Sequence, residues 1–108
     1  MKEINVEELK LKIDNNEDFI FLDVREPFEA YMSKIDIETL FIPDQELEGR
    51  ISELESDKDS EIIVMCRSGN RSAKACELLK ENGFPDVKNL KGGINEWARK
   101  IDPSLPVY

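Results

Sequence analysis

The segment Ile62-Ile63-Val64-Met65-Cys66-Arg67-Ser68-Gly69-Asn70-Arg71-Ser72 decides how this chain folds. Four large apolar residues lead into a cysteine, a short polar loop follows, and a helical pattern runs from Ser72 to Leu79. A continuous apolar run of this length, bounded by polar residues, is typical of a buried parallel strand. The cysteine is therefore expected where a strand ends and a helix begins, which is where open α/β sheets bind their ligands.

The loop after this strand has the composition of an anion site. The first backbone N–H groups of a helix have no partner inside the helix, and together with the helix dipole they attract negative charge. Arg67 and Arg71 add permanent positive charge, and Gly69 allows backbone angles that a side chain would forbid. This setting favours the thiolate form of a cysteine. We therefore predict that Cys66 is a nucleophile facing an anionic substrate, whereas an isolated cysteine is more often simply buried.

The composition restricts the classes of function. The chain has 108 residues and a formal net charge of -9. This length predicts one domain (1–108), and this charge argues against binding to nucleic acid or to an anionic membrane. No apolar run approaches the length of about 18 residues needed to span a membrane, and the start has no signal-peptide pattern. We expect a cytoplasmic protein, or a mature form whose leader has been removed.

The residue inventory also excludes several catalytic arrangements. The sequence has no histidine, so it cannot form a Cys–His dyad, a Ser-His-Asp triad or a histidine zinc site. The two cysteines, Cys66 and Cys76, lack the C-x-x-C spacing, and we predict neither a metal nor another cofactor. Cys76 shares an apolar helical stripe with Ala75 and Leu79, which predicts a core residue; a resolving cysteine is the alternative.

The rest of the chain alternates between strand and helix patterns. Strands are expected over 2–4, 19–22, 39–42, 62–65 and 87–90, with helical patterns between them and a last helix over 94–101. Asn5 and Glu8 have the spacing of a capping box. Asp23 is interpreted as a helix cap or a paired strand-end carboxylate, and Arg25 as an exposed or paired arginine. The alternation predicts an α/β fold with a parallel sheet covered on both faces.

Three blocks of the sequence resemble the single-domain rhodanese (thiosulfate sulfurtransferase) family. They are Leu22-Asp23-Val24-Arg25-Glu26-Pro27, Cys66-Arg67-Ser68-Gly69-Asn70-Arg71-Ser72, and Asn89-Leu90-Lys91-Gly92-Gly93-Ile94 with Trp97. The blocks occur in the family's order, and the resemblance covers nearly the whole chain. It implies a three-layer rhodanese-like fold, with a parallel sheet of about five strands between helices.

The resemblance also implies a reaction and a set of site residues. A Cys66 thiolate would attack the outer sulfur of thiosulfate or a similar small anionic donor, sulfite would leave, and a persulfide would remain. A thiol, possibly on a protein, or cyanide would then accept the sulfur. The family's substrate-binding loop corresponds to Arg67, Ser68, Gly69, Asn70 and Arg71, with both arginines holding the donor. Asp23 and Arg25 would support the fold around the site.

Loop length separates this expectation from a related one. Phosphatases that share the fold resemble it with a longer Cys-x5-Arg loop, whereas this chain has the shorter Cys-x4-Arg form. The smaller ring of amides favours sulfur transfer over phosphatase chemistry, and arsenate reduction is a further alternative. The segment Ser33–Thr39 departs from the Gly-His-Ile-Pro-Gly pattern common among relatives, because it lacks the glycines and is one residue longer. This departure keeps open a non-catalytic or sulfur-relay interaction module.

Overall fold

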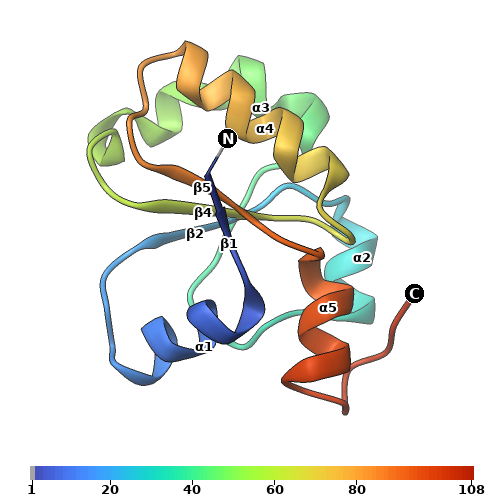
Figure 1. Ribbon diagram of the computed structural model, residues 1–108. Coiled ribbons are helices and arrows are strands. Elements are labelled where there is room, and N and C mark those ends of the chain that lie inside the picture. Colours follow the sequence, from blue (N-terminus) through green and yellow to red (C-terminus); the bar gives the residue numbers. More distant parts are fainter. Residues whose placement is uncertain (1) are drawn as a thin grey trace.

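The structure, a computed structural model, describes residues 2–108 and contains the predicted parallel sheet of five strands. The strands lie side by side in the order β1-β5-β4-β2-β3, and every neighbouring pair is parallel (Figure 1). Their bounds are β1 (Lys2–Ile4), β2 (Ile20–Asp23), β3 (Leu40–Phe41), β4 (Ile62–Met65) and β5 (Val87–Leu90). The apolar run at 62–65 thus forms the central strand, as its composition predicts.

Helices cover both faces of the sheet, so the three-layer prediction is confirmed. They are α1 (Val6–Asp14), α2 (Pro27–Met32), α3 (Asp44–Arg50), the 3-10 helix η1 (Ile51–Asp57), α4 (Asn70–Glu81) and α5 (Gly93–Lys100). One face carries α1 and α5, and the other carries α3 and α4 (Figure 1). Side chains of β4 alternate between the two cores: Val64 packs in the cluster under α3 and α4, and Ile63 in the cluster with α1 and α5.

Local sequence signals explain several element boundaries. The capping box at the start of α1 is present, because Asn5 Oδ1 accepts the Glu8 N–H at 2.7 Å and Glu8 Oε1 accepts the Asn5 N–H at 3.0 Å. Pro27 occupies the first turn of α2. The helix α4 begins at Asn70 rather than at Ser72, because Gly69 has a left-handed φ of +107° and turns the chain directly into the helix.

Two elements are shorter than their patterns predict. The strand expected over 39–42 contains only β3, an edge strand, and Pro43 follows it without an N–H for further pairing. The helical pattern between the strands expected over 39–42 and 62–65 is divided between α3 and η1, whose Leu47 and Leu54 are buried.

The unusual segment Ser33–Thr39 packs against the fold. Its Ile35 is buried in the cluster with α1 and α5, and Thr39 Oγ1 donates to the Ile37 carbonyl at 2.8 Å. Ser33 is also buried, and its hydroxyl has no hydrogen-bond partner among residues 2–108. Over the same residues, no helix is long and apolar enough to cross a membrane.

Candidate active site

Cys66 lies just after β4, at the carboxyl end of the sheet, and its Sγ atom faces backbone donors. The Gly69 N–H donates to Sγ at 3.1 Å, and the Ser72 N–H donates at 3.4 Å. Only 1% of Cys66 is exposed. The loop of residues 66–71, termed the Cys66 loop below, therefore turns toward the sulfur and continues into the first turn of α4. Such donors stabilise a negatively charged sulfur.

The start of α5 is hydrogen-bonded to the main chain of the Cys66 loop. The N–H of Ile94 donates to the Cys66 carbonyl at 3.0 Å, and the N–H of Asn95 donates to the Arg67 carbonyl at 3.1 Å. Gly93 makes this approach possible: its φ is +61°, and a Cβ there would lie 2.5 Å from both carbonyl oxygens. Two carbonyls are thus directed at α5 and away from the sulfur.

A third polar group near the sulfur is the hydroxyl of Ser72, a fully buried residue. Its Oγ lies 3.2 Å from Cys66 Sγ and donates to Asn89 Oδ1 at 2.5 Å, while Asn89 Nδ2 donates to the Gly69 carbonyl at 3.1 Å. A hydroxyl has one proton, so Ser72 can donate either to Asn89 or to a Cys66 thiolate at one time. Ser72 is therefore able to follow the protonation state of the sulfur.

Arg71 is engaged by a carboxylate from another part of the chain. Its Nη1 and Nη2 atoms donate to the two carboxylate oxygens of Glu29 on α2, at 2.7 and 2.8 Å. The Arg71 guanidinium lowers the pKa of Glu29 to about 2, and Glu29 in turn raises the pKa of Arg71. Both terminal nitrogens of Arg71 are thus already bound, and donor binding by Arg71 stays a prediction.

The remaining predicted loop residues lie at the outer rim of the site. Ser68, Asn70 and Arg67 are exposed. Arg67 Nε donates to the carbonyl oxygen of Tyr108 at 2.5 Å, and the guanidinium lies 5.4 Å from the centre of the Tyr108 ring. The Nε atom of Arg67 is therefore engaged in a hydrogen bond within the protein.

Asp23 and Arg25 form a buried ion pair at the end of β2. Arg25 Nη2 lies 2.8 Å from Asp23 Oδ2, and the side chains are 0% and 1% exposed. Of the interpretations left open by the sequence, the paired one is correct for both residues. Arg25 Nη1 also donates to the Tyr108 hydroxyl at 2.9 Å, which in turn contacts Glu29. The pair is thereby connected to Arg71, and its predicted supporting role is compatible with this position.

Cys76 is a core residue whose thiol is held in its protonated form. It is 0% exposed in the cluster under α3 and α4, and burial raises the pKa of its thiol to about 12. It therefore stays protonated at neutral pH, as expected of a core residue. Residues 2–108 also contain no group of three or more His, Cys, Asp or Glu that could hold a metal ion.

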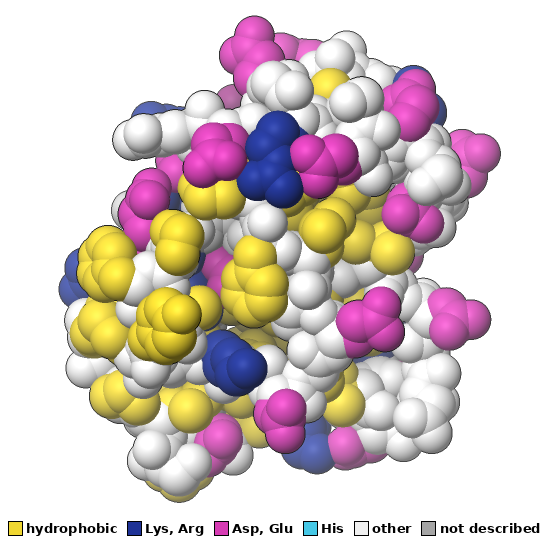
Figure 2. Space-filling view, turned by 180° about the vertical axis from the view of Figure 1, so that it is seen from behind, with side chains coloured by type: hydrophobic (Ala, Val, Ile, Leu, Met, Phe, Trp, Pro, Cys, Tyr) yellow, Lys and Arg dark blue, Asp and Glu magenta, His cyan; other side chains and the backbone are white. Residues whose placement is uncertain are grey.

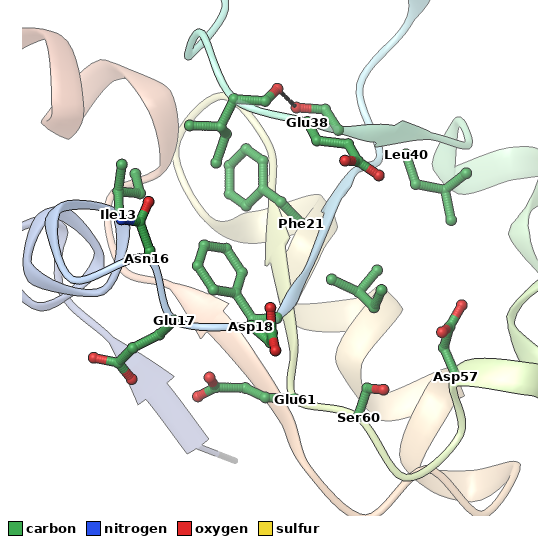
Figure 3. Close-up of a pocket in the computed structure, with 14 residues that line it drawn as sticks. Ile13, Asn16, Glu17, Asp18, Phe21, Glu38, Leu40, Asp57, Ser60 and Glu61 are labelled. Atoms are coloured by element: carbon green, nitrogen blue, oxygen red, sulfur yellow. Dashed lines mark hydrogen bonds between the residues drawn. The ribbon is translucent and has the colours of Figure 1, made fainter.

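One hollow of the surface is remote from Cys66. It has a volume of about 970 Å³ and lies where β2 begins, between the end of α1 and the chain before β3 and β4 (Figure 3). Its wall includes Phe21 and Leu40, and acidic side chains such as Asp18, Glu38 and Asp57 surround it. Because the Cys66 loop lies at the opposite, carboxyl end of the strands, this groove does not contribute to the sulfur site.

Comparisons with known proteins assign this sheet and loop to a family. The protein-family model described as Rhodanese-like domain matches residues 5–100 of this chain. The chain belongs to this family. This rhodanese-like domain is 37% identical over 99 residues to a protein of Allochromatium vinosum named Sulfurtransferase, covering 92% of this chain and 90% of that one. The crystal structure of a rhodanese-related protein from Thermoplasma volcanium has a TM-score of 0.80 and 35% identity, covering 100% of this chain and 98% of that one.

Some relatives are much longer than this rhodanese-like domain. The maize (Zea mays) protein named Adenylyltransferase and sulfurtransferase MOCS3-1 is 36% identical over 110 residues, which are 97% of this chain but only 23% of that protein. The chain thus spans about a quarter of such relatives, and it matches proteins of its own size as well.

Sequence reasoning missed five residues around the site: Glu29, Ser72, Asn89, Asn95 and Tyr108. Ser72 and Asn89 stand at the edges of two of the blocks that resemble the family, and that position was the available signal. No pattern within α2 predicts a role for Glu29, because its partner Arg71 is 42 residues away in sequence.

Proposed function

We propose that this rhodanese-like domain is a sulfurtransferase that carries sulfur as a persulfide on Cys66. The observation that supports this proposal best is the position of Cys66 Sγ, which receives N–H groups from Gly69 and Ser72 at the carboxyl end of the central strand. Homologues named sulfurtransferase are consistent with it.

The proposed reaction has two steps, and each is a substitution at sulfur. The Cys66 thiolate attacks the outer sulfur of thiosulfate, the S–S bond of the donor breaks, and sulfite leaves with the electron pair. The product is a Cys66 persulfide anion, whose charge the loop amides stabilise. An acceptor thiolate or cyanide then attacks the outer sulfur of the persulfide, and the Cys66 thiolate is the leaving group.

The Cys66 loop also favours this reaction over phosphate chemistry. The loop is six residues long counting Cys66 and Arg71, and α5 holds its carbonyls at 3.0 and 3.1 Å. A ring held in this way suits one sulfur atom rather than a tetrahedral phosphoryl or arsenate group. Turnover of phenyl phosphate or arsenate by the wild-type protein would contradict this assignment.

Intact-mass measurement tests the proposal directly. Incubation with thiosulfate should add one sulfur atom to the wild-type protein, and a reductant should remove it. Cys66→Ser should abolish the addition, whereas Cys76→Ser should retain it because that thiol is buried and protonated. An unchanged wild-type mass, or addition at Cys76 instead, would overturn the proposal.

A sulfur relay to a partner protein is the second candidate, and an exposed apolar patch favours it. Phe28, Tyr31 and Met32 on α2, together with Phe41 on β3, are 45–93% exposed. Hydrophobic side chains gather on this side of the molecule (Figure 2), and α2 also provides Glu29 to the Cys66 loop. If the relay is the function, Cys66 should accept sulfur, discharge slowly to cyanide and discharge rapidly to a protein thiol.

A further inference from the structure

Tyr108 contacts more parts of the site than any pattern in the sequence indicates. It lies in the segment after α5, which runs beside α5 toward α2 (Figure 1). Its main chain and its side chain touch four residues: Asn95 on α5, Arg67 in the Cys66 loop, Glu29 on α2 and Arg25 after β2. One residue thus joins the two loop arginines to the scaffold.

The main chain of Tyr108 is held by Asn95 and holds Arg67. Asn95 is buried, its Nδ2 donates to the Tyr108 carbonyl at 2.9 Å, and its Oδ1 accepts the Tyr108 N–H at 3.2 Å. The same carbonyl accepts Arg67 Nε at 2.5 Å, and the ring lies 5.4 Å from the guanidinium. These contacts fix an exposed, otherwise flexible side chain in one orientation. Among residues 2–108, the Nη1 and Nη2 atoms of Arg67 donate to no protein acceptor, in contrast to Nε.

The phenol of Tyr108 acts on the other arginine through Glu29. Arg25 can only donate, so the phenol accepts from Arg25 Nη1 at 2.9 Å and donates its own proton to Glu29 Oε1 at 2.9 Å. Glu29 Oε1 also accepts Arg71 Nη2 at 2.8 Å. Burial raises the pKa of Tyr108, so the hydroxyl keeps the proton that this bond needs. The Glu29–Arg71 pair is thereby fixed as well.

We propose that Tyr108 is a positioning residue that sets the affinity of the site for an anionic sulfur donor. Its carbonyl and ring present the free edge of Arg67, and its phenol orients the carboxylate that holds Arg71. This inference rests on the proposed sulfurtransferase function, because the donor is the anion that these arginines would meet. A guanidinium that is already oriented binds an anion better than one that must first be ordered.

Steady-state kinetics with cyanide as the acceptor test this role. Tyr108→Ala should raise the KM for thiosulfate about tenfold with kcat changed by less than about twofold, because the cation–π contact to Arg67 and the charge-assisted hydrogen bond to Glu29 are lost. Tyr108→Phe loses only the hydroxyl and keeps the ring beside Arg67, so its KM should rise only about threefold. Val107→Ala, at an exposed neighbouring side chain, is the matched control and should match the wild type.

A second donor distinguishes positioning from a merely structural effect. Thiosulfate carries two negative charges and an alkyl thiosulfonate carries one, so the KM increase should be larger for thiosulfate. Equal increases for both donors, or unchanged KM values in both Tyr108 variants, would overturn the inference. If Tyr108→Ala does not fold, Tyr108→Phe and Asn95→Ala decide the same comparison. Failure of the proposed function has a different signature, since the wild type itself would then take up no sulfur.

Discussion

Gly93→Ala is the sharpest test of how the fold shapes the Cys66 loop. The φ of Gly93 is +61°, and an added Cβ would lie 2.5 Å from the carbonyl oxygens of Cys66 and Arg67. Nothing flexible is in the way, because both atoms belong to the main chain. The substitution must therefore push the start of α5 away from the loop.

The expected cost follows from these contacts. A residue with a Cβ in the left-handed region loses about 1–2 kcal/mol. Separation of α5 from the loop also weakens the Ile94–Cys66 and Asn95–Arg67 hydrogen bonds, each of which is worth about 1 kcal/mol. The sum is about 3–4 kcal/mol, which lowers the Tm by roughly 12–16 °C at about 4 °C per kcal/mol for a domain of this size. Sulfur loading from thiosulfate should slow as well, because the loop amides lose their orientation.

Circular dichroism melting and intact-mass loading, the latter below the melting range, measure the two effects. Gly49→Ala is the matched control: it lies in α3, and a Cβ there would meet nothing within 4 Å. Alanine should stabilise that helix by about 0.5–1 kcal/mol. The reasoning is refuted if Gly93→Ala melts within a few degrees of the wild type and loads sulfur at the same rate.

Three further substitutions test the polar contacts of the site and of the core. The pKa of Glu29 is lowered to about 2 by Arg71, so its stabilisation is complete above its ordinary pKa of 4.5 and is lost as the pH falls toward 2. Glu29→Gln should lower the unfolding free energy at neutral pH by about 3 kcal/mol and flatten this acid dependence in urea titrations; an unchanged acid slope would contradict it. Ser72→Ala should slow sulfur loading of Cys66 about tenfold, because a thiolate loses a hydroxyl donor; stopped-flow consumption of thiosulfate measures this, and a wild-type rate would contradict it. Ser33→Ala should raise the unfolding free energy by up to about 1 kcal/mol, because it removes a buried hydroxyl without a partner; a loss of stability in urea would argue against it.

The sequence predicts the strands and the place of Cys66 because these depend on local patterns. The run Ile62–Met65 is apolar on both faces, and the structure places it at the centre of the sheet with all four residues buried. The position of Gly69 before a helix likewise predicts the turn that brings amides to the sulfur. Such features need only a few neighbouring residues.

The contacts that orient the arginines could not be predicted in this way. Tyr108 meets Arg67 across 41 residues of sequence and Arg25 across 83. Each partner is a polar residue in a segment with no helical or strand period. The assembly of the parallel sheet and the return of the chain after α5 bring these residues together. Sequence periodicity carries no information about such long-range contacts.

The near-complete enclosure of Cys66, with 1% of the residue exposed, restricts the shape of any acceptor. A persulfide on Cys66 would extend the side chain by one S–S bond of about 2 Å, and an acceptor would have to reach its terminal sulfur past the loop that encloses Cys66. Cyanide and small thiols are slender, so this enclosure should hinder them least. A protein acceptor would have to offer its thiol on a projecting loop or a free chain end, since two flat faces in contact would leave the reacting atoms apart.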